Sequence, residues 1–266
     1  YPEAHPYSWI TIGHIKDIES YTLEDVQSFY QRYYSPKNAT IVVAGDIKKE
    51  NTVELINKYF GEIKPFEIAA SPKISSFELS QNVFIKHEDN VQLERIYLTW
   101  PSELNFGKDD APLEILADIL SGSKNSRLHK KLVFDLQVSQ DITSFQYSGK
   151  FGGQFVIVST IKPGQNADDI KSIILDEIND LSINGISDKE FEKSKNRIKS
   201  QFVYSMQNLD NIADLLNYYN YYLGEPNSFE FDLNRYNSIS NNDIKNSVKK
   251  YLLKPFVELR VTPRKK

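Results

Sequence analysis

The 266-residue chain has no cysteine and only one methionine, Met206. The lack of cysteine excludes a disulfide framework, a thiolate metal site and a cysteine nucleophile, but it leaves the compartment open. Because the chain starts at Tyr1, we expect that Tyr1 is not a translational start. Either a leader was removed or the chain is part of a longer protein, and no signal peptide is visible in the residues present.

Blocks of like charge and long apolar runs are missing as well. Lys and Arg are interleaved with Asp and Glu and the formal net charge is −4, so neither nucleic acid nor an anionic membrane surface is expected as a partner. No apolar run approaches the roughly 20 residues of a membrane span. With 40% hydrophobic and 26% charged residues, the composition is that of a globular protein with a core.

Histidine is scarce, and the closest two histidines are nine residues apart. Two histidines four residues apart would share a helix face and could bind one zinc ion, but this chain has no such pair. His5 lies near Glu3 in an expected loop. Two possible ligands in a loop are weak evidence for a metal site, so ordinary packing is the favoured interpretation. In His87-Glu88-Asp89, neighbouring strand residues point to opposite faces, which favours a polar strand end. The four histidines are His5, His14, His87 and His129.

Cap signals and hydrophobic periodicity predict alternating helices and strands. Thr22 with Asp25, and Ser187 with Glu190, are typical of helix N-termini. The glycine cluster at 149–153 favours a hairpin, since it lacks the Gly-Lys-Ser/Thr of a phosphate-binding loop. Helices are expected over 22–34, 50–60, 110–120, 126–136, 167–181, 187–224 and 243–253, and strands over 39–44, 82–87, 93–100, 142–147, 154–161 and 256–261.

Strands in hairpin pairs that alternate with helix pairs predict an α+β fold. In such a fold, helices cover one face of a largely antiparallel sheet. Residues 65–76 contain prolines, alanines and serines without strong periodicity, and they are expected to form a linker.

An internal repeat relates the two ends of the chain. Residues 21–45 align without a gap to residues 239–263, at an offset of 218. Thr22 then matches Ser240 as an N-cap, and Ile41 matches Leu259 in the following strand. The ungapped register favours a duplicated domain over a chance match, so the N-terminal copy is expected to be a partial one.

Several segments, taken in order and spacing, resemble the insulinase/pitrilysin family of zinc metallopeptidases, which includes mitochondrial processing peptidases and bacterial members. The resemblance implies two homologous α+β domains. Residues 1–64 would be the C-terminal part of the first, catalytic-type domain, and residues 77–266 the complete second, non-catalytic domain. The segments are Tyr1-Pro2-Glu3-Ala4-His5-Pro6-Tyr7, residues 22–46, Ser126-Arg127-Leu128 and residues 195–204.

The family's zinc site is H-x-x-E-H on a helix of the first domain, with the Glu as general base on a zinc-bound water. This chain has no such motif, so we expect no catalytic and no metal-ligating residue in it, and zinc only in a longer parent. The family also places an Arg and a Tyr seven residues apart after the Ser-Arg-Leu segment. Val133 and Gln140 occupy these positions, which resembles a zinc-bearing subunit that needs a partner.

For two further groups of residues, a structural role is favoured over a functional one. Arg197 and Tyr204 are also seven residues apart, but they lie within an expected long helix. A tyrosine band late in that helix could bind peptide side chains, although a core or interface stripe is favoured. The band comprises Tyr218, Tyr219, Tyr221 and Tyr222.

Two functions are therefore weighed. The chain is expected to be the non-catalytic, substrate-cradling portion of an insulinase-like zinc metallopeptidase that hydrolyses peptides. The alternative is a non-catalytic family member that acts as an assembly or peptide-binding partner. The resemblance implies a peptide substrate and a homo- or heterodimer with a related subunit. Bacterial relatives favour the periplasm or cell envelope, with the cytoplasm as the alternative location.

Overall fold

A computed structural model describes residues 1–74 and 77–264. The chain divides into two compact units, and we describe each by itself. Unit 1 comprises residues 1–75 and 205–227, and unit 2 comprises residues 76–204 and 228–266. The helix that follows residue 205 thus belongs to unit 1, although unit 2 precedes and follows it in the sequence. Of the predicted linker 65–76, residues 65–74 form neither helix nor strand, and 75 and 76 lie outside the described residues.

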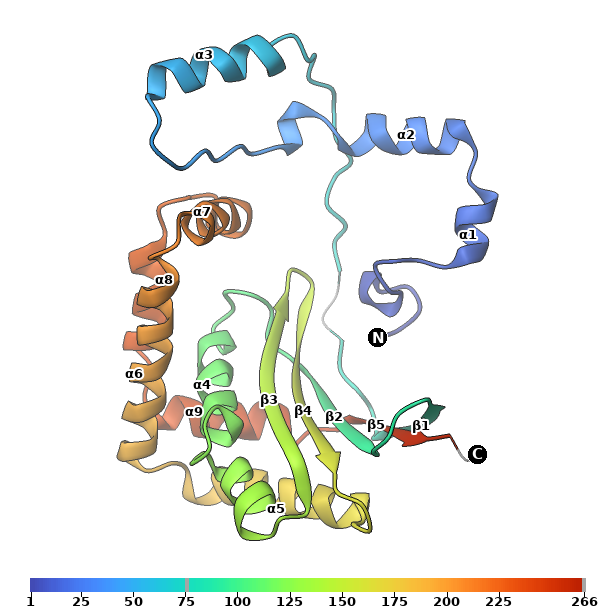
Figure 1. Ribbon diagram of the computed structural model, residues 1–266, viewed down its shortest axis with the longest axis vertical. Helices are drawn as coiled ribbons and strands as arrows, with labels where there is room; N and C mark the ends of the chain where they lie inside the picture. Colours follow the sequence, from blue (N-terminus) through green and yellow to red (C-terminus); the bar gives the residue numbers. More distant parts are fainter. Residues whose placement is uncertain (75–76, 265–266) are drawn as a thin grey trace. The chain divides into compact units, whose positions relative to one another are not determined.

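A five-stranded sheet forms the centre of unit 2, in the order β1-β5-β2-β4-β3 (Figure 1). β5 pairs in parallel with β1, whereas the β2–β5, β2–β4 and β3–β4 pairs are antiparallel. The predicted α+β fold with a largely antiparallel sheet is therefore confirmed. The strands are β1 (Val83–Asp89), β2 (Arg95–Ser102), β3 (Ser139–Gly149), β4 (Gly152–Ile161) and β5 (Val257–Pro263).

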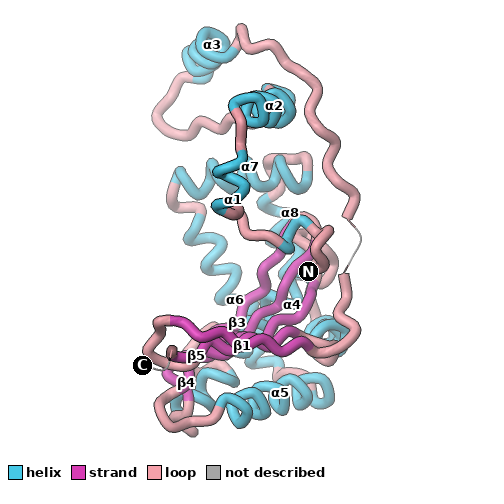
Figure 2. Tube along the Cα trace, turned by 90° about the vertical axis from the view of Figure 1, so that its right-hand side faces the viewer, coloured by secondary structure: helices cyan, strands magenta, loops and turns pink. Residues whose placement is uncertain are grey.

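Helices cover one face of this sheet, as predicted. Ile96, Leu98 and Trp100 of β2 are buried and alternate with more exposed neighbours, because successive strand residues point to opposite faces. They share one hydrophobic core with residues of α4, α5 and α9, and Figure 2 shows α5 along one side of the strands. The helices of unit 2 are α4 (Asp110–Ser121), η3 (His129–Asp135), α5 (Ala167–Asn184), α6 (Asp188–Ser205), α8 (Phe229–Asn237), α9 (Asn241–Ser247) and η4 (Val248–Leu252).

The glycine cluster forms the predicted hairpin, with Gly149 of β3 opposite Gly152 of β4. A Cβ at Gly153 would collide with the backbone carbonyl of Glu103, so glycine permits a close approach to the loop after β2. The amide of Asn105 in that loop donates to the carbonyl of Gly149 at 3.0 Å. The hairpin and the loop after β2 are thereby held together.

Unit 1 consists of helices and extended chain. The predicted strand over 39–44 is wrong, because these residues pair with no strand within the described part of the chain. A strand depends on a neighbour for its backbone hydrogen bonds, and the described residues of unit 1 supply none. The elements of unit 1 are η1 (Pro6–Ser8), α1 (Ile15–Ser20), α2 (Leu23–Tyr33), η2 (Pro36–Asn38), α3 (Lys49–Phe60) and α7 (Leu209–Leu223).

The single long helix predicted over 187–224 is also wrong, since α6 ends at Ser205 and α7 begins at Leu209. Asn208 starts the second helix because its side-chain carbonyl accepts a hydrogen bond from the amide of Asp210 at 2.8 Å. Apolar residues continue at helical spacing on both sides of Asn208, so the sequence pattern did not indicate that one helix ends and another begins there. No helix in the described residues has the length and apolar character that a membrane span requires.

A group of charged side chains is buried between α4 and α8. Arg235 donates through Nη1 to Asp110 Oδ2 at 2.9 Å and through Nη2 to Asp232 Oδ1 at 2.6 Å. The hydroxyl of Tyr236 donates to Glu114. Burial raises the pKa of Glu114, and the nearby carboxylate of Asp110 adds to this effect. One guanidinium thus binds two carboxylates, while the pKa of the third carboxyl group, that of Glu114, is raised by its burial.

Replacing Glu114 with Gln should therefore change how stability depends on pH. The unfolded carboxyl titrates near its ordinary pKa of 4.5, whereas the folded one holds its proton to higher pH. The contribution of Glu114 is thus complete below that value and declines as the pH rises above it. Urea unfolding at about pH 5 and about pH 8 should show the variant gaining stability relative to wild type at the higher pH. Exposed Glu192→Gln should show no such gain, and a pH-independent difference for Glu114→Gln would contradict the assignment.

Candidate functional site

The Ser126-Arg127-Leu128 segment lies between the end of α4 and η3. Leu128 is fully buried in the core. The hydroxyl of Ser126 donates to the carbonyl of Asp118 at 3.0 Å, which fixes the segment to the last turns of α4. With these two side chains directed inward, Arg127 lies between α5 and α6.

The guanidinium of Arg127 binds two helices and the turn between them. Its Nε and Nη2 donate to the two carboxylate oxygens of Glu190 at 2.7 and 3.0 Å. Its Nη1 donates to Glu177 at 3.0 Å and to Asp180 at 3.3 Å, and Nη2 also reaches the carbonyl of Gly185 at 3.4 Å. The hydrogen bonds from Arg127 lower the pKa of Glu190 to about 2. The segment is therefore a structural joint of unit 2.

Val133 and Gln140, which the resemblance places at the family's Arg and Tyr positions, lie in different environments. Val133 belongs to η3 and packs against the hydrophobic core. Gln140 lies at an exposed bulge at the start of β3, where the register shifts between Ser139 and Asp141. A bulge leaves the extra residue without a partner across the ladder. Only Gln140 therefore presents a polar group, and its amide carries no charge.

The path from η3 into β3 includes a residue with left-handed backbone geometry. Gln137 has a φ of 54°, a region that non-glycine residues seldom occupy. The amide of Val138 donates to the carbonyl of Leu132 at 3.0 Å, and the carbonyl of Val138 accepts from the amide of Lys162 at 3.0 Å, so the residue after Gln137 is held on both sides. η3 itself is π-helical, since the amide of Leu136 donates to the carbonyl of Lys131 five residues earlier. π-helical turns are frequent at functional sites, but the sequence predicted only an ordinary short helix here.

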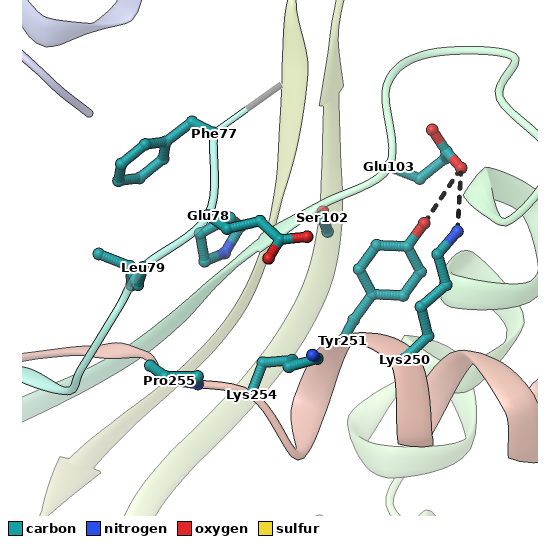
Figure 3. A pocket seen from close by; sticks show the side chains of 10 residues that line it. Phe77, Glu78, Leu79, Ser102, Glu103, Lys250, Tyr251, Lys254 and Pro255 are labelled. Atoms are coloured by element: carbon teal, nitrogen blue, oxygen red, sulfur yellow. Dashed lines mark hydrogen bonds and ion pairs between the residues drawn. The ribbon is translucent and has the colours of Figure 1, made fainter. Parts of the chain in front are cut away.

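A pocket of about 260 Å³ lies in unit 2 beside the ends of β2 and η4 (Figure 3). Apolar side chains, including Leu79 and Pro255, form part of its wall. Glu78 and Lys254 contribute a carboxylate and an ammonium group that form no ion pair within residues 1–74 and 77–264. The pocket is lined by Phe77, Glu78, Leu79, Pro101, Ser102, Glu103, Lys250, Tyr251, Lys254 and Pro255.

Tyr251 sits between two carboxylates at this pocket. Its hydroxyl is 3.1 Å from Glu103 Oε2 and 3.0 Å from Asp109 Oδ2, while Lys250 lies 2.5 Å from Asp109. Burial, aided by the two carboxylates, raises the pKa of Tyr251, so the hydroxyl remains a donor. The sequence did not predict this site because its residues come from three separate segments. At the offset of 218 in the internal repeat, Tyr251 matches Tyr33, but this match does not indicate a pocket.

The histidines do not form a metal site. Within residues 1–74 and 77–264, no three His, Cys, Asp or Glu side chains are grouped so that they could hold a metal ion. His5 caps η1, where its Nδ1 accepts a hydrogen bond from the amide of Tyr7 at 3.0 Å and its ring stacks on Tyr1. His5 therefore has a structural role at the start of η1.

Arg197 and the tyrosine band also take structural positions. Arg197 Nε lies 3.4 Å from Asp118 Oδ1, whereas Tyr204 is exposed. In α7, Tyr219 is buried, and Tyr222 makes ring contacts with both Tyr218 and Tyr221. The band thus combines core packing with mutual ring contacts.

The chain is similar to a described protein family and to several curated proteins. The family described as "Peptidase M16 inactive domain" matches residues 20–198. The chain is 28% identical over 214 residues to the "Zinc protease PqqE" of Helicobacter pylori, a match that covers 79% of the chain and 48% of that protein. It is 24% identical over 221 residues to the "Probable mitochondrial-processing peptidase subunit beta, mitochondrial" of Arabidopsis thaliana, covering 79% and 41%.

Solved structures share the fold. The structure of a peptidase M16 inactive domain from Pseudomonas fluorescens is similar with a TM-score of 0.86 at 17% identity, over 99% of this chain and 62% of that one. The chain spans about half the length of the curated relatives it matches.

Replacing Arg127 with Met should strongly destabilise unit 2. The variant leaves the partly buried Glu190 without the cation that binds it and leaves Glu177 with Lys131 at 3.5 Å, and breaking such a network typically costs about 3 kcal/mol or more. Lys130→Met is the matched control, because Lys130 is exposed and its one ion pair within the described residues is with Asp135, and it should cost less than about 1 kcal/mol. The free energy of unfolding in urea at neutral pH tests both. Equal effects of the two variants would contradict the structural role of Arg127.

Proposed function

Because the chain belongs to the Peptidase M16 inactive domain family, we propose that it is the non-catalytic, substrate-cradling part of an insulinase-like zinc metallopeptidase that hydrolyses peptides. The observation that carries this proposal is the family match, which runs from the end of α1 through most of unit 2. In the proposal, zinc and its ligands lie in a longer parent protein. The contribution of this chain is to bind and orient the substrate.

The start of β3 suits an extended peptide best. β3 lies at the edge of the sheet and pairs with one strand, β4. The hydroxyl of Ser121 already accepts a hydrogen bond from the amide of Ser144, so the proposed binding stretch is residues 140–143. A peptide that adds to a sheet edge gains main-chain hydrogen bonds, and the amide of Gln140 can both donate and accept.

Val133, at the family's Arg position, is the reason why the proposal includes a partner subunit. The half-buried side chain of this valine supplies neither charge nor hydrogen bonds to a substrate. The proposal therefore includes a related subunit, in a homo- or heterodimer, that contributes an Arg and a Tyr to the reaction. A periplasmic or cell-envelope location belongs to the same proposal.

Replacing Gln140 with Ala should weaken binding of an unfolded, fluorescently labelled peptide several-fold. The reason is the loss of the exposed amide that the extra residue of the bulge presents at the edge. Fluorescence anisotropy with the 266-residue chain measures the dissociation constant. His87→Ala, on the opposite edge strand β1, is the control and should leave it unchanged. If both variants bind like wild type, β3 is not the peptide site.

Zinc analysis and a peptidase assay separate this function from the alternative of an assembly partner. A longer protein that includes this chain should bind about one zinc ion per chain, as a single H-x-x-E-H site does, and cleave unfolded peptides. Its coding sequence should contain H-x-x-E-H ahead of Tyr1. A longer protein that holds no zinc and cleaves nothing would favour the assembly role.

A further inference from the structure

The pocket at the end of β2 is lined by two charged side chains of opposite sign that have no partner. The carboxylate of Glu78 and the ammonium group of Lys254 form no hydrogen bond and no ion pair with the described residues. Figure 3 shows both side chains extending toward Tyr251, from segments that are far apart in the sequence. One carboxylate and one ammonium group are therefore available to a ligand in the same small space.

The other polar groups of this pocket are already engaged. Glu103 lies 3.1 Å from the hydroxyl of Tyr251 and 3.9 Å from the ammonium group of Lys250. The hydroxyl of Ser102 donates to a side chain of β3 at 2.9 Å. A ligand that bound these groups would first have to displace their present partners. A ligand therefore gains most from the two charges without partners.

The two segments that carry these charges are fixed to each other. The amide of Phe256 donates to the side-chain carbonyl of Asn82 at 3.0 Å, and the amide of Val83 donates to the carbonyl of Phe256 at 3.0 Å. Phe256 belongs to the hydrophobic core, and Tyr251 packs against that core. Because these contacts hold the walls in place, a ligand has little ordering to do when it binds.

Size and apolar lining restrict what the pocket can hold. Its volume is about 260 Å³, which is below the roughly 300–1,000 Å³ of pockets that take drug-sized molecules. An apolar wall favours an apolar ligand body, while a few polar groups fix its orientation. The complement is a small molecule with one ammonium group, one carboxylate and apolar side chains. The apolar lining residues are Phe77, Leu79, Pro101 and Pro255.

We propose that this pocket binds a short apolar peptide with both ends free, about two residues long. The terminal ammonium group of the peptide pairs with Glu78, and its terminal carboxylate pairs with Lys254. Its side chains lie on the apolar wall. Hydrogen bonds between such charged groups are stronger than those between neutral ones, so the two ends give the site its selectivity for a peptide with free termini.

This site is separate from the proposed binding stretch on β3. Pro101 of the pocket lies near the end of β2. Asp141, which follows Gln140, pairs with Thr160 of β4, and Thr160 pairs in turn with Arg95 at the start of β2. The pocket and residues 140–143 therefore lie toward opposite ends of the strands, and the inference does not depend on the proposed function.

Isothermal titration calorimetry with the 266-residue chain tests the proposal. The dipeptide leucyl-leucine should bind saturably. N-acetyl-leucyl-leucine lacks the ammonium group, leucyl-leucine amide lacks the carboxylate, and glycylglycine lacks the apolar side chains. Each should bind about three- to tenfold more weakly, as expected when one contact to an exposed charge or the apolar contact is lost. Equal dissociation constants for all four peptides, or no saturable binding of leucyl-leucine, would overturn the proposal.

Variants of the two exposed charges assign each end of the peptide. Glu78→Gln should weaken leucyl-leucine but not its N-acetyl derivative, which has no ammonium group to lose. Lys254→Gln should weaken leucyl-leucine but not its amide. Lys86→Gln and Glu88→Gln, exposed in β1 and outside the pocket lining, are the matched controls and should bind all four peptides like wild type. Unchanged binding in both pocket variants, or equal losses in the controls, would overturn the proposal.

Discussion

The guanidinium of Arg127 joins parts of unit 2 that are about 50 to 63 residues apart in sequence. Gly185, at a φ of 72°, allows the chain to reverse between α5 and α6, and Arg127 then binds a carboxylate of each helix. η3 and the start of β3 follow directly from this joint. The ion network of Arg127 therefore anchors the start of the segment that leads through η3 to Gln140.

The two internal charge networks differ in what decides the protonation of their carboxyl groups. At Glu190, the paired hydrogen bonds from Arg127 outweigh burial, so its pKa is low. At Glu114, burial is the largest effect, and the hydroxyl of Tyr236 compensates for it only in part. Because a charged hydrogen bond offsets desolvation only when its geometry is good, the bidentate pair favours the charged form of Glu190, whereas burial favours the protonated form of Glu114.

Much of the fold followed from local signals. The capping boxes at Thr22, Ser187 and Ser240 have the predicted hydrogen bonds, and the glycine cluster at 149–153 forms its hairpin, because these features depend on residues within a few positions of each other. The bulge at Gln140 and the pocket around Tyr251 could not be predicted in the same way. They arise where a strand meets its neighbour or where separate segments converge, and neither leaves a periodic pattern.

The same distinction explains why one half of the N-terminal motif folds as predicted and the other half does not. A helix closes its hydrogen bonds within four residues, so α2 forms beside its cap even while Val26 and Tyr30 remain exposed. A strand draws its hydrogen bonds from another segment, and residues 39–44 have no strand partner within the described part of the chain. β5 shows that the matching sequence does form a strand when β1 and β2 flank it. The presence of flanking strands is therefore what distinguishes β5 from residues 39–44 within the described part of the chain.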